Sequence, residues 1–170
     1  MSFQVAVLTV SDRSFAGERE DISGPAVAER VSLEGWEVIR TDIVPDDMEK
    51  IADVFRTWSD QKAVDVILST GGTGFAPRDV TPEATRAVVD RNAPGLTEAM
   101  RAVSMDITPH AMLSRAEAGI RNATLIINLP GSPKAAVENL EVVLPVLPHA
   151  VALLRGDSDA EKGHHDLNRE

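Results

Sequence analysis

The fold is decided by the stretch Leu68-Ser69-Thr70-Gly71-Gly72-Thr73-Gly74-Phe75-Ala76-Pro77-Arg78-Asp79-Val80-Thr81-Pro82-Glu83. A largely apolar run at 64–68 leads into it, and three glycines then follow within four positions. An Arg-Asp pair at 78–79 and a Thr-Pro-Glu sequence at 81–83 come next, and the latter is typical of a helix start. The stretch therefore predicts a buried strand, an open loop and a helix, in that order. A ligand is expected at this loop.

The loop and the helix after it are suited to an anion. Glycines just past the carboxyl end of a strand let main-chain N–H groups turn toward one point, with no Cβ in the way. Thr81 is expected to cap the helix, with Pro82 in its first turn, so the positive end of the helix dipole faces the same region. Arg78 and Asp79 add a cation and a carboxylate beside whatever binds.

Two better-known glycine motifs are excluded. The phosphate-binding pattern G-x-x-x-x-G-K-[ST] fails because no Lys-Ser or Lys-Thr follows the glycines. The dinucleotide pattern G-x-G-x-x-G fails because a Phe-Ala-Pro sequence follows Gly74. A tight connection whose glycines serve only backbone geometry stays open as an alternative. The attached Arg, Asp and helix start favour an anion-binding loop.

Composition indicates one domain without thiol chemistry. With 170 residues and 18.3 kDa the chain is long enough for one sizeable core. It has no cysteine, which excludes disulfides, thiolate metal sites and cysteine nucleophiles. We expect a single domain over 1–156 and a polar, disordered tail over 157–170. His164 and His165 in that tail could take up a metal, although a solvated tail is favoured.

The net charge and the hydropathy of the chain limit the kinds of partner that it can bind. The net charge of −10 and the pI near 4.8 argue against nucleic-acid binding, which needs a basic face. No apolar stretch is expected to approach the roughly 20 residues of a membrane span. No basic leader precedes the first strand, so a cytoplasmic location is expected. The charge of an anionic substrate must then be met locally by basic residues, backbone amides or a metal ion.

Strands alternate with helices along the chain, and several strands end in polar loops. Strands are expected at 3–10, 36–44 and 64–68, and a hairpin is expected at 118–129. This order predicts an α/β protein: a three-layer α/β/α sandwich with a mostly parallel central sheet plus a β-hairpin. Ligands of such sheets bind beyond the carboxyl ends of the strands. The loops that should meet there begin at Ser11, Asp46, Gly71 and Gly131.

The polar segment after the first strand is a second candidate wall of this site. It runs from Ser11 through Gly17 and Glu18 to Asp21. A solvated loop with no ligand is the alternative reading of this segment. Its position at a strand end places it beside the glycine loop if the sheet is parallel.

Four motifs, in the same order, resemble one known family. They are Thr9-Val10-Ser11-Asp12-Arg13, then Thr70-Gly71-Gly72-Thr73-Gly74 with Arg78-Asp79-Val80-Thr81-Pro82-Glu83, then Leu113-Ser114-Arg115, and finally Asn128-Leu129-Pro130-Gly131-Ser132-Pro133-Lys134. Together they resemble the molybdenum-cofactor biosynthesis proteins of the molybdopterin adenylyltransferase (MogA/MoaB-like) type. The resemblance covers nearly the whole chain and stops near Gly156. The joint pattern is highly specific.

The resemblance implies a molybdopterin-binding-like fold and a reaction. That reaction transfers AMP from Mg-ATP to the terminal phosphate of molybdopterin and releases pyrophosphate. The resemblance also implies a homo-oligomer, a trimer or, in the MoaB-like branch, a hexamer, and it suggests the downstream molybdate-inserting protein as a partner. Longer molybdate-inserting proteins carry the same fold. This chain has no room for their extra domains, which favours the stand-alone adenylyltransferase.

Residue by residue, the resemblance places the important aspartates of the family at Asp46 and Asp79. Two carboxylates that converge on a triphosphate suit Mg²⁺, which bridges phosphate oxygens and offsets charge during in-line displacement. Phosphate or nucleotide would be held by the main-chain amides of Gly71, Gly72, Thr73 and Gly74. The nucleotide pocket would be completed by Gly131, Ser132 and Lys134, and the pterin-phosphate side by Ser11, Asp12, Ser114 and Arg115.

Structural roles stay open for some of these residues. Asp46 and Asp47 are adjacent, and either could only cap a helix. Ser132 and Lys134 could be ordinary helix-start residues, but a cation at a helix N-terminus is disfavoured by the dipole, which indicates a nearby anion. A non-catalytic protein that carries or protects molybdopterin is the alternative function, and the presence of both Asp46 and Asp79 favours the enzyme. A nicotinamide enzyme is set aside because no G-x-G-x-x-G follows the first strand.

Overall fold

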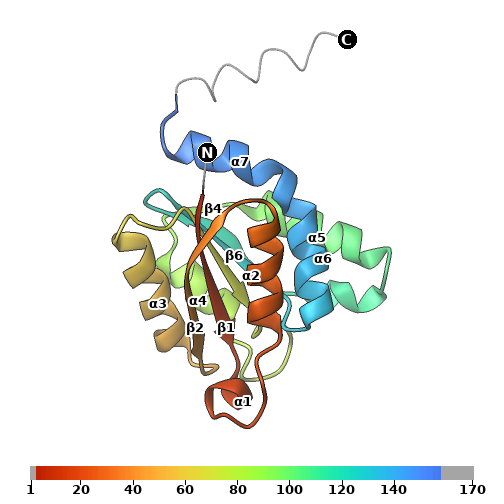
Figure 1. Cartoon of the computed structure of the whole chain (residues 1–170). Coiled ribbons are helices and arrows are strands. Elements are labelled where there is room, and N and C mark those ends of the chain that lie inside the picture. Colours follow the sequence, from red (N-terminus) through yellow and green to blue (C-terminus); the bar gives the residue numbers. More distant parts are fainter. Residues whose placement is uncertain (1–2, 158–170) are drawn as a thin grey trace.

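The central sheet has six strands in the order β2-β1-β3-β6-β5-β4 (Figure 1). A computed structural model describes residues 3–157. Strands β2, β1, β3 and β6 run parallel, and β5 pairs antiparallel with both β6 and β4. The strands are β1 (Gln4–Val10), β2 (Glu37–Val44), β3 (Val66–Thr70), β4 (Arg91–Asn92), β5 (Ala118–Arg121) and β6 (Thr124–Leu129). The predicted mostly parallel sheet with a hairpin is confirmed.

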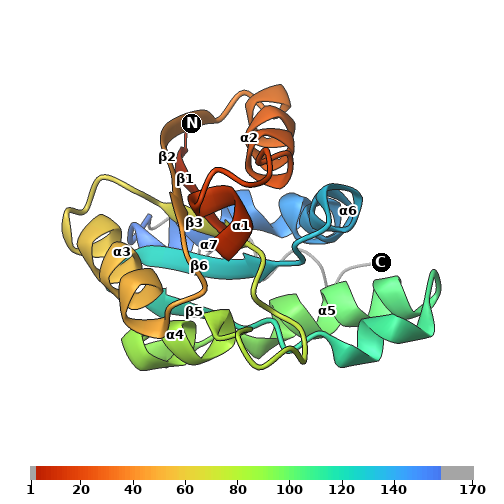
Figure 2. The ribbon, with the colours of Figure 1, turned by 90° about the horizontal axis from the view of Figure 1, so that it is seen from below.

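Helices cover both faces of this sheet, which completes the predicted three-layer sandwich (Figure 2). One face carries α2 (Ser23–Leu33), α5 (Pro94–Met105), α6 (Pro133–Val143) and α7 (Leu147–Leu154), and the other carries α3 (Met48–Asp60) and α4 (Thr81–Val88). Short helical turns complete the chain: α1 (Asp12–Phe15), η1 (Pro109–Leu113) and η2 (Leu144–Val146).

The parallel strands are apolar on both faces because each face meets helices. In β1, Val5 and Val7 join the core under α2 and α6, whereas Ala6 and Leu8 join the core under α3 and α4. All five residues of β3 are buried. Strands buried on both sides read as continuous apolar runs rather than as alternating patterns. This is why the first and third strands were recognisable from sequence.

The register of the parallel strands aligns their carboxyl ends. Thr9 lies opposite Ile43 of β2 and Thr70 of β3, and Thr70 lies opposite Leu129 of β6. The loops that follow these four strands therefore start from one edge of the sheet. They are the loops predicted to meet at a ligand site.

Two local predictions were wrong in detail. Ser11 to Ser14 is not a loop, because Ser11 caps the one-turn helix α1 by accepting a hydrogen bond from the Ser14 amide. Thr81 is not the cap of α4 but its first residue, after Val80. Its buried hydroxyl instead donates to the Gly71 carbonyl oxygen at 2.9 Å. Thr81 therefore ties the start of the helix to the glycine loop.

The helical run from Pro133 to Leu154 corrects another expectation. By length and composition alone it is long and apolar enough to cross a membrane. Its apolar character has a different explanation in this fold, because Leu140, Val143, Leu147 and Val151 are buried against the sheet. The predicted disordered tail, with His164 and His165, lies outside the described residues apart from Asp157.

Candidate functional site

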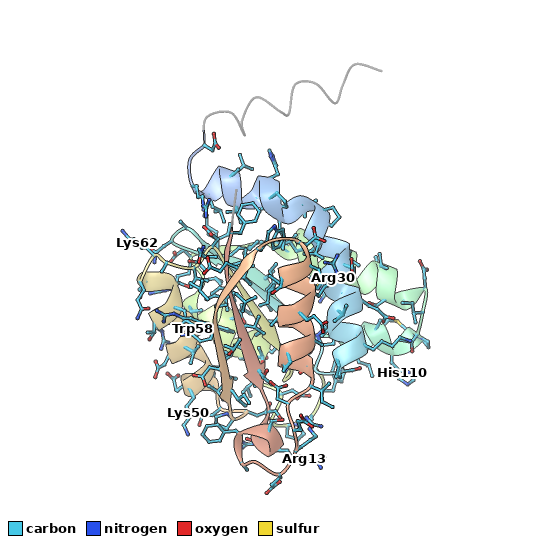
Figure 3. The ribbon with its side chains drawn as sticks, in the orientation of Figure 1. Arg13, Arg30, Lys50, Trp58, Lys62 and His110 are labelled. Atoms are coloured by element: carbon cyan, nitrogen blue, oxygen red, sulfur yellow. The ribbon has the colours of Figure 1, made fainter. Side chains whose placement is uncertain are left out.

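A cavity of about 600 Å³ lies at the carboxyl edge of the sheet. It is lined by residues 9–14, 19–23, 70–72 and 131–133, with Asp46, Ala76, Arg78 and Asp79. The structure thus brings together nine of the predicted site residues: Ser11, Asp12, Asp46, Gly71, Gly72, Arg78, Asp79, Gly131 and Ser132. Arg13, labelled in Figure 3, marks this end of the molecule. We call this space the first cavity.

A second cavity, of about 270 Å³, lies on the other side of the glycine loop. Its lining contains three more predicted residues, Thr73, Gly74 and Ser114. The rest of its lining is Arg101, Ser104, Thr108, His110, Ala111, Leu113, Pro130, Ala135 and Asn139. The glycine loop therefore contributes to two adjoining spaces, with residues 70–72 facing one and residues 73–74 the other.

Two predicted residues line neither of these cavities. The Lys134 side chain is 82% exposed, and its Nζ lies 3.8 Å from Glu138 of the same helix. Arg115 is partly buried beneath the glycine loop, where its side chain bonds to protein groups.

Asp12 and Asp46 hold each other through reciprocal hydrogen bonds. The Asp12 amide donates to Asp46 Oδ2 at 2.8 Å, and the Asp46 amide donates to Asp12 Oδ1 at 3.0 Å. Arg78 crosses from the glycine loop and donates from Nη2 to Asp12 Oδ1 and to the Asp46 carbonyl oxygen, both at 2.9 Å. Three loops from three strands are joined at this point. Asp47, not Asp46, caps α3, because its side chain accepts from the Lys50 amide.

The charges in this cluster are not balanced. Burial raises the pKa of Asp46, and the neighbouring charges of Asp12 and Asp79 raise it further. The hydrogen bond from Arg78 holds the pKa of Asp12 below its ordinary value. One guanidinium thus lies among three carboxylates, and it pairs with only one of them. An added cation would stabilise the ionised form of Asp46.

Asp79 is positioned by its own loop. Its Oδ2 accepts from the Ala76 amide at 2.9 Å, and its amide donates to the Ala76 carbonyl oxygen at 2.9 Å. Its other carboxylate oxygen, like Oδ1 of Asp46, accepts no hydrogen bond from the residues that the structure describes. Each aspartate therefore keeps one free oxygen at the first cavity.

Gly71 and Gly72 are required by backbone conformation and by space. Their φ angles are +101° and +66°, in the region that L side chains rarely adopt. A Cβ at Gly71 would lie 2.2 Å from the Val10 carbonyl oxygen. A Cβ at Gly72 would lie 2.3 Å from Thr81 Oγ1 and 3.1 Å from Asp46 Oδ1. The loop can approach β1 and Asp46 only because both positions lack side chains.

The polar segment after β1 lies in the wall of the first cavity, as expected. Asp21 fixes it by accepting from the Thr9 hydroxyl at 2.7 Å and from the Gly24 amide at 3.1 Å. The sequence did not single out Arg19, whose Nη2 donates to Ser11 Oγ at 3.3 Å. Its place within the polar segment was the only available signal. Arg19 adds a second cation to this wall.

The fold and the site define an α/β protein with a glycine-rich loop and two partly free carboxylates at the carboxyl edge of its sheet. Comparison with known proteins gives the family. Residues 6–149 match the family MoCF_biosynth, described as "Probable molybdopterin binding domain". The chain belongs to this family.

Similar proteins with established names span different lengths. A molybdopterin adenylyltransferase of Helicobacter pylori is 43% identical over 92% of this chain and 90% of its own length. Gephyrin of Dictyostelium discoideum is 48% identical over 88% of this chain, which spans only 22% of gephyrin. The structure of the molybdopterin biosynthesis enzyme MoaB from Thermus thermophilus is 54% identical with a TM-score of 0.86, covering 91% of this chain and 98% of that one.

Proposed function

We propose that this chain is a molybdopterin adenylyltransferase, which transfers AMP from ATP to the terminal phosphate of molybdopterin and releases pyrophosphate. One observation carries the proposal: Asp46 and Asp79 reach one cavity together with the open glycine loop. The name of the Helicobacter relative, which matches this chain over nearly its full length, supports the same activity.

The two cavities suit the two substrates. The first cavity is the larger and contains the carboxylates, so we place the triphosphate of ATP there, against residues 70–72 and 131–133. The second cavity, with Thr73, Gly74 and Ser114, would take the pterin. The glycine loop would then lie where the pterin phosphate meets the α-phosphate of ATP. Ser11 and Asp12 belong to the nucleotide side in this arrangement, rather than to the pterin-phosphate side.

The carboxylates of Asp46 and Asp79 are chemically suited to Mg²⁺. Each presents one oxygen free of hydrogen bonds within the described chain, and Mg²⁺ prefers oxygen ligands. Within residues 3–157, no three His, Asp or Glu side chains are grouped for a metal ion. This fits a cation that one or two carboxylates share with substrate phosphates. When bound, Mg²⁺ would neutralise charge on the phosphates during displacement.

The residues of this chain orient the substrate phosphates, and none of them forms a covalent bond to a substrate. The phosphate of molybdopterin is itself the nucleophile, so no side chain has to attack. Main-chain amides of the glycine loop and the N-terminus of α4 orient the phosphates. Arg78 lines the cavity, where its hydrogen bonds to Asp12 and to the Asp46 carbonyl oxygen hold the loops together. The reciprocal bonds between Asp12 and Asp46 keep the Asp46 carboxylate directed at the cavity.

Oligomerisation and location are part of this proposal. Several apolar side chains around α5 and η1 are exposed: Val103, Met105, Ile107, Met112 and Leu113. Exposed apolar groups gathered in this way suit a contact between subunits, and we propose a homo-oligomer. We propose that the chain works as a soluble protein of the cytoplasm and delivers its product to a molybdate-inserting protein.

Pyrophosphate release tests the activity. The purified protein is incubated with Mg-ATP, with and without molybdopterin, in parallel with Asp79→Ala. Release that requires molybdopterin and is lost in the folded variant is expected. Molybdopterin binding without pyrophosphate release would contradict the proposal. It would support the alternative of a carrier protein.

A further inference from the structure

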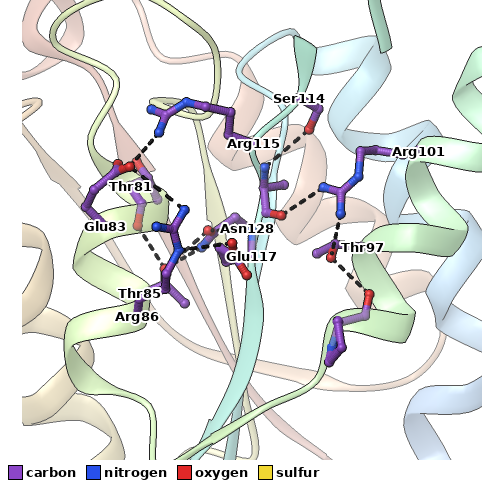
Figure 4. Close-up of polar contacts among 12 residues, drawn as sticks. Thr81, Glu83, Thr85, Arg86, Thr97, Arg101, Ser114, Arg115, Glu117 and Asn128 are labelled. Atoms are coloured by element: carbon purple, nitrogen blue, oxygen red, sulfur yellow. Dashed lines mark hydrogen bonds and ion pairs between the residues drawn. The ribbon is translucent and has the colours of Figure 1, made fainter. Parts of the chain in front are cut away.

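Arg115 donates hydrogen bonds from all three of its guanidinium nitrogens. Nε donates to the Gly74 carbonyl oxygen at 2.8 Å, and Nη2 donates to the Asp79 carbonyl oxygen at 2.6 Å. Nη1 pairs with Glu83, as Figure 4 shows. The Arg115 amide also donates to the Thr73 carbonyl oxygen at 2.9 Å. One residue therefore holds both ends of the segment 74–79.

The segment 74–79 connects the two cavities. Its first residue, Gly74, lines the second cavity, and its last two residues, Arg78 and Asp79, line the first. Ser114, which precedes Arg115, also lines the second cavity. Arg115 itself lies behind the segment and lines neither of these two cavities.

Glu83 is the third acceptor of the Arg115 side chain. Burial raises the pKa of Glu83, but the hydrogen bond from Arg115, a backbone hydrogen bond and the charges of Arg115 and Arg86 together outweigh it and leave the pKa below its ordinary value. The guanidinium is thus neutralised within the chain by a carboxylate on α4. A cation committed in this way is poorly suited to bind a substrate phosphate.

We propose that Arg115 is a positioning residue, which fixes the backbone of 74–79 so that Asp79 and Arg78 are held at the first cavity. The planar fork of the guanidinium is what spans the two carbonyls and Glu83. A lysine keeps the charge but offers a single nitrogen and cannot span all three acceptors. The effect expected on kcat rests on the proposed function. The effect expected on the backbone of 74–79 does not.

Arg115→Lys is the informative variant, and Arg121→Lys is its matched control. Arg121 also uses three guanidinium nitrogens, for Asp60 and the Val88 carbonyl oxygen, but it lies at the opposite end of the sheet. Misplacement of a catalytic group by about 1 Å can cost about 100-fold in rate. We expect Arg115→Lys to lower kcat by about that factor with little change in the KM for ATP. Arg121→Lys should leave both constants unchanged.

A measurement without substrate separates this inference from the proposed function. Hydrogen exchange of the ligand-free protein is followed at the amides of Ala76 and Asp79. Exchange should be faster at both amides in Arg115→Lys than in the unaltered protein, whether or not the protein transfers AMP, and unchanged in Arg121→Lys. The inference would be overturned if both amides exchanged as slowly in Arg115→Lys as in the unaltered protein. A raised KM for a substrate with unchanged kcat would also overturn it, because that would indicate direct phosphate binding by Arg115.

Discussion

The two ends of the central sheet differ in whether their carboxylates are paired with arginines. At the amino end of the parallel strands, two carboxylates each pair with an arginine. Asp60 accepts from Nε and Nη2 of Arg121 at 3.0 and 2.9 Å, and Asp65 lies 2.6 Å from Arg155. At the carboxyl end, Asp46 and Asp79 have no such partner among the described residues, and Arg78 pairs with Asp12 instead.

This difference separates charges that hold the fold from charges that serve a ligand. Paired charges at the amino end connect β5 and the end of α7 to neighbouring elements. Like charges gathered without compensation lower stability, and they persist where a ligand or a cation supplies the missing charge. The comparison therefore predicts opposite effects of substitution at the two ends.

The largest effect is expected at the carboxyl end, from Asp79→Asn. The variant keeps the shape of the side chain but loses its charge, so turnover should fall by about 100-fold or more, as when a group that stabilises the transition state is removed. The urea midpoint of unfolding should stay close to that of the unaltered protein. The assay is pyrophosphate release under saturating substrates. Unchanged turnover would remove Asp79 from the chemistry.

A smaller but clear effect is expected from Gly72→Ala, with Gly35→Ala as its control. Both glycines have φ angles near +70°, namely +66° and +76°, so both variants carry backbone strain. Only the Cβ at Gly72 would collide with a neighbour, since a Cβ at Gly35 has open space around it. Each variant should lose about 1–3 kcal/mol of unfolding free energy, and only Gly72→Ala should lose most activity. Equal activity in the two variants would contradict the role of the loop.

The amino end should show the reverse pattern in Asp65→Ala. This change removes one carboxylate partner of Arg155 and leaves the Gln4 amide without its 2.8 Å acceptor. An unsatisfied donor costs about 1–3 kcal/mol of unfolding free energy. kcat should stay unchanged at temperatures where the variant is folded. A loss of kcat larger than the loss of folded protein would show that the two ends are coupled.

The smallest effect is expected in the unfolding free energy of Asp46→Asn. The pKa of Asp46 is raised in the folded state, so its contribution is favourable below its ordinary pKa of 3.8 and is lost as pH rises through the folded value. At pH 7 the ionised carboxylate therefore destabilises the ligand-free protein, and Asn should stabilise it, by less than about 1 kcal/mol because Asp46 is partly solvated. Unfolding in urea at pH 7 and pH 3 measures this gain, which should vanish at pH 3. A destabilised variant at pH 7 would contradict the charge imbalance.

Much of the fold could be predicted because each element had a local signal. The buried strands β1 and β3 read as apolar runs, and the glycine loop marked the edge where the site lies. The role of Thr81 could not be predicted, because its hydroxyl bonds to Gly71, ten residues earlier, and only the folded chain brings them together. The expectation that no apolar stretch approaches the length of a membrane span was wrong for residues 133–154, because a helical run that covers this sheet is as long and as apolar as a span.

The candidate site was predictable in position more than in detail. The aspartates and the first glycines converge because parallel strands end at one edge. The separation into two cavities depends on how the loop 71–79 folds over Arg115, and no sequence pattern specifies that path. The resemblance placed Arg115 on the pterin-phosphate side of the site, whereas in the structure its side chain hydrogen-bonds to Gly74, Asp79 and Glu83.

The fate of the α-phosphate of ATP tests the central claim most directly. ATP that carries a radiolabel at either the α- or the γ-phosphate is incubated with Mg²⁺, molybdopterin and the protein, and the pterin product is separated from pyrophosphate. The account predicts that the α-label appears on the pterin and the γ-label in pyrophosphate, with both signals lost in Asp79→Asn. A γ-label on the pterin, or no label on it while molybdopterin is bound, would contradict adenylyl transfer at this site.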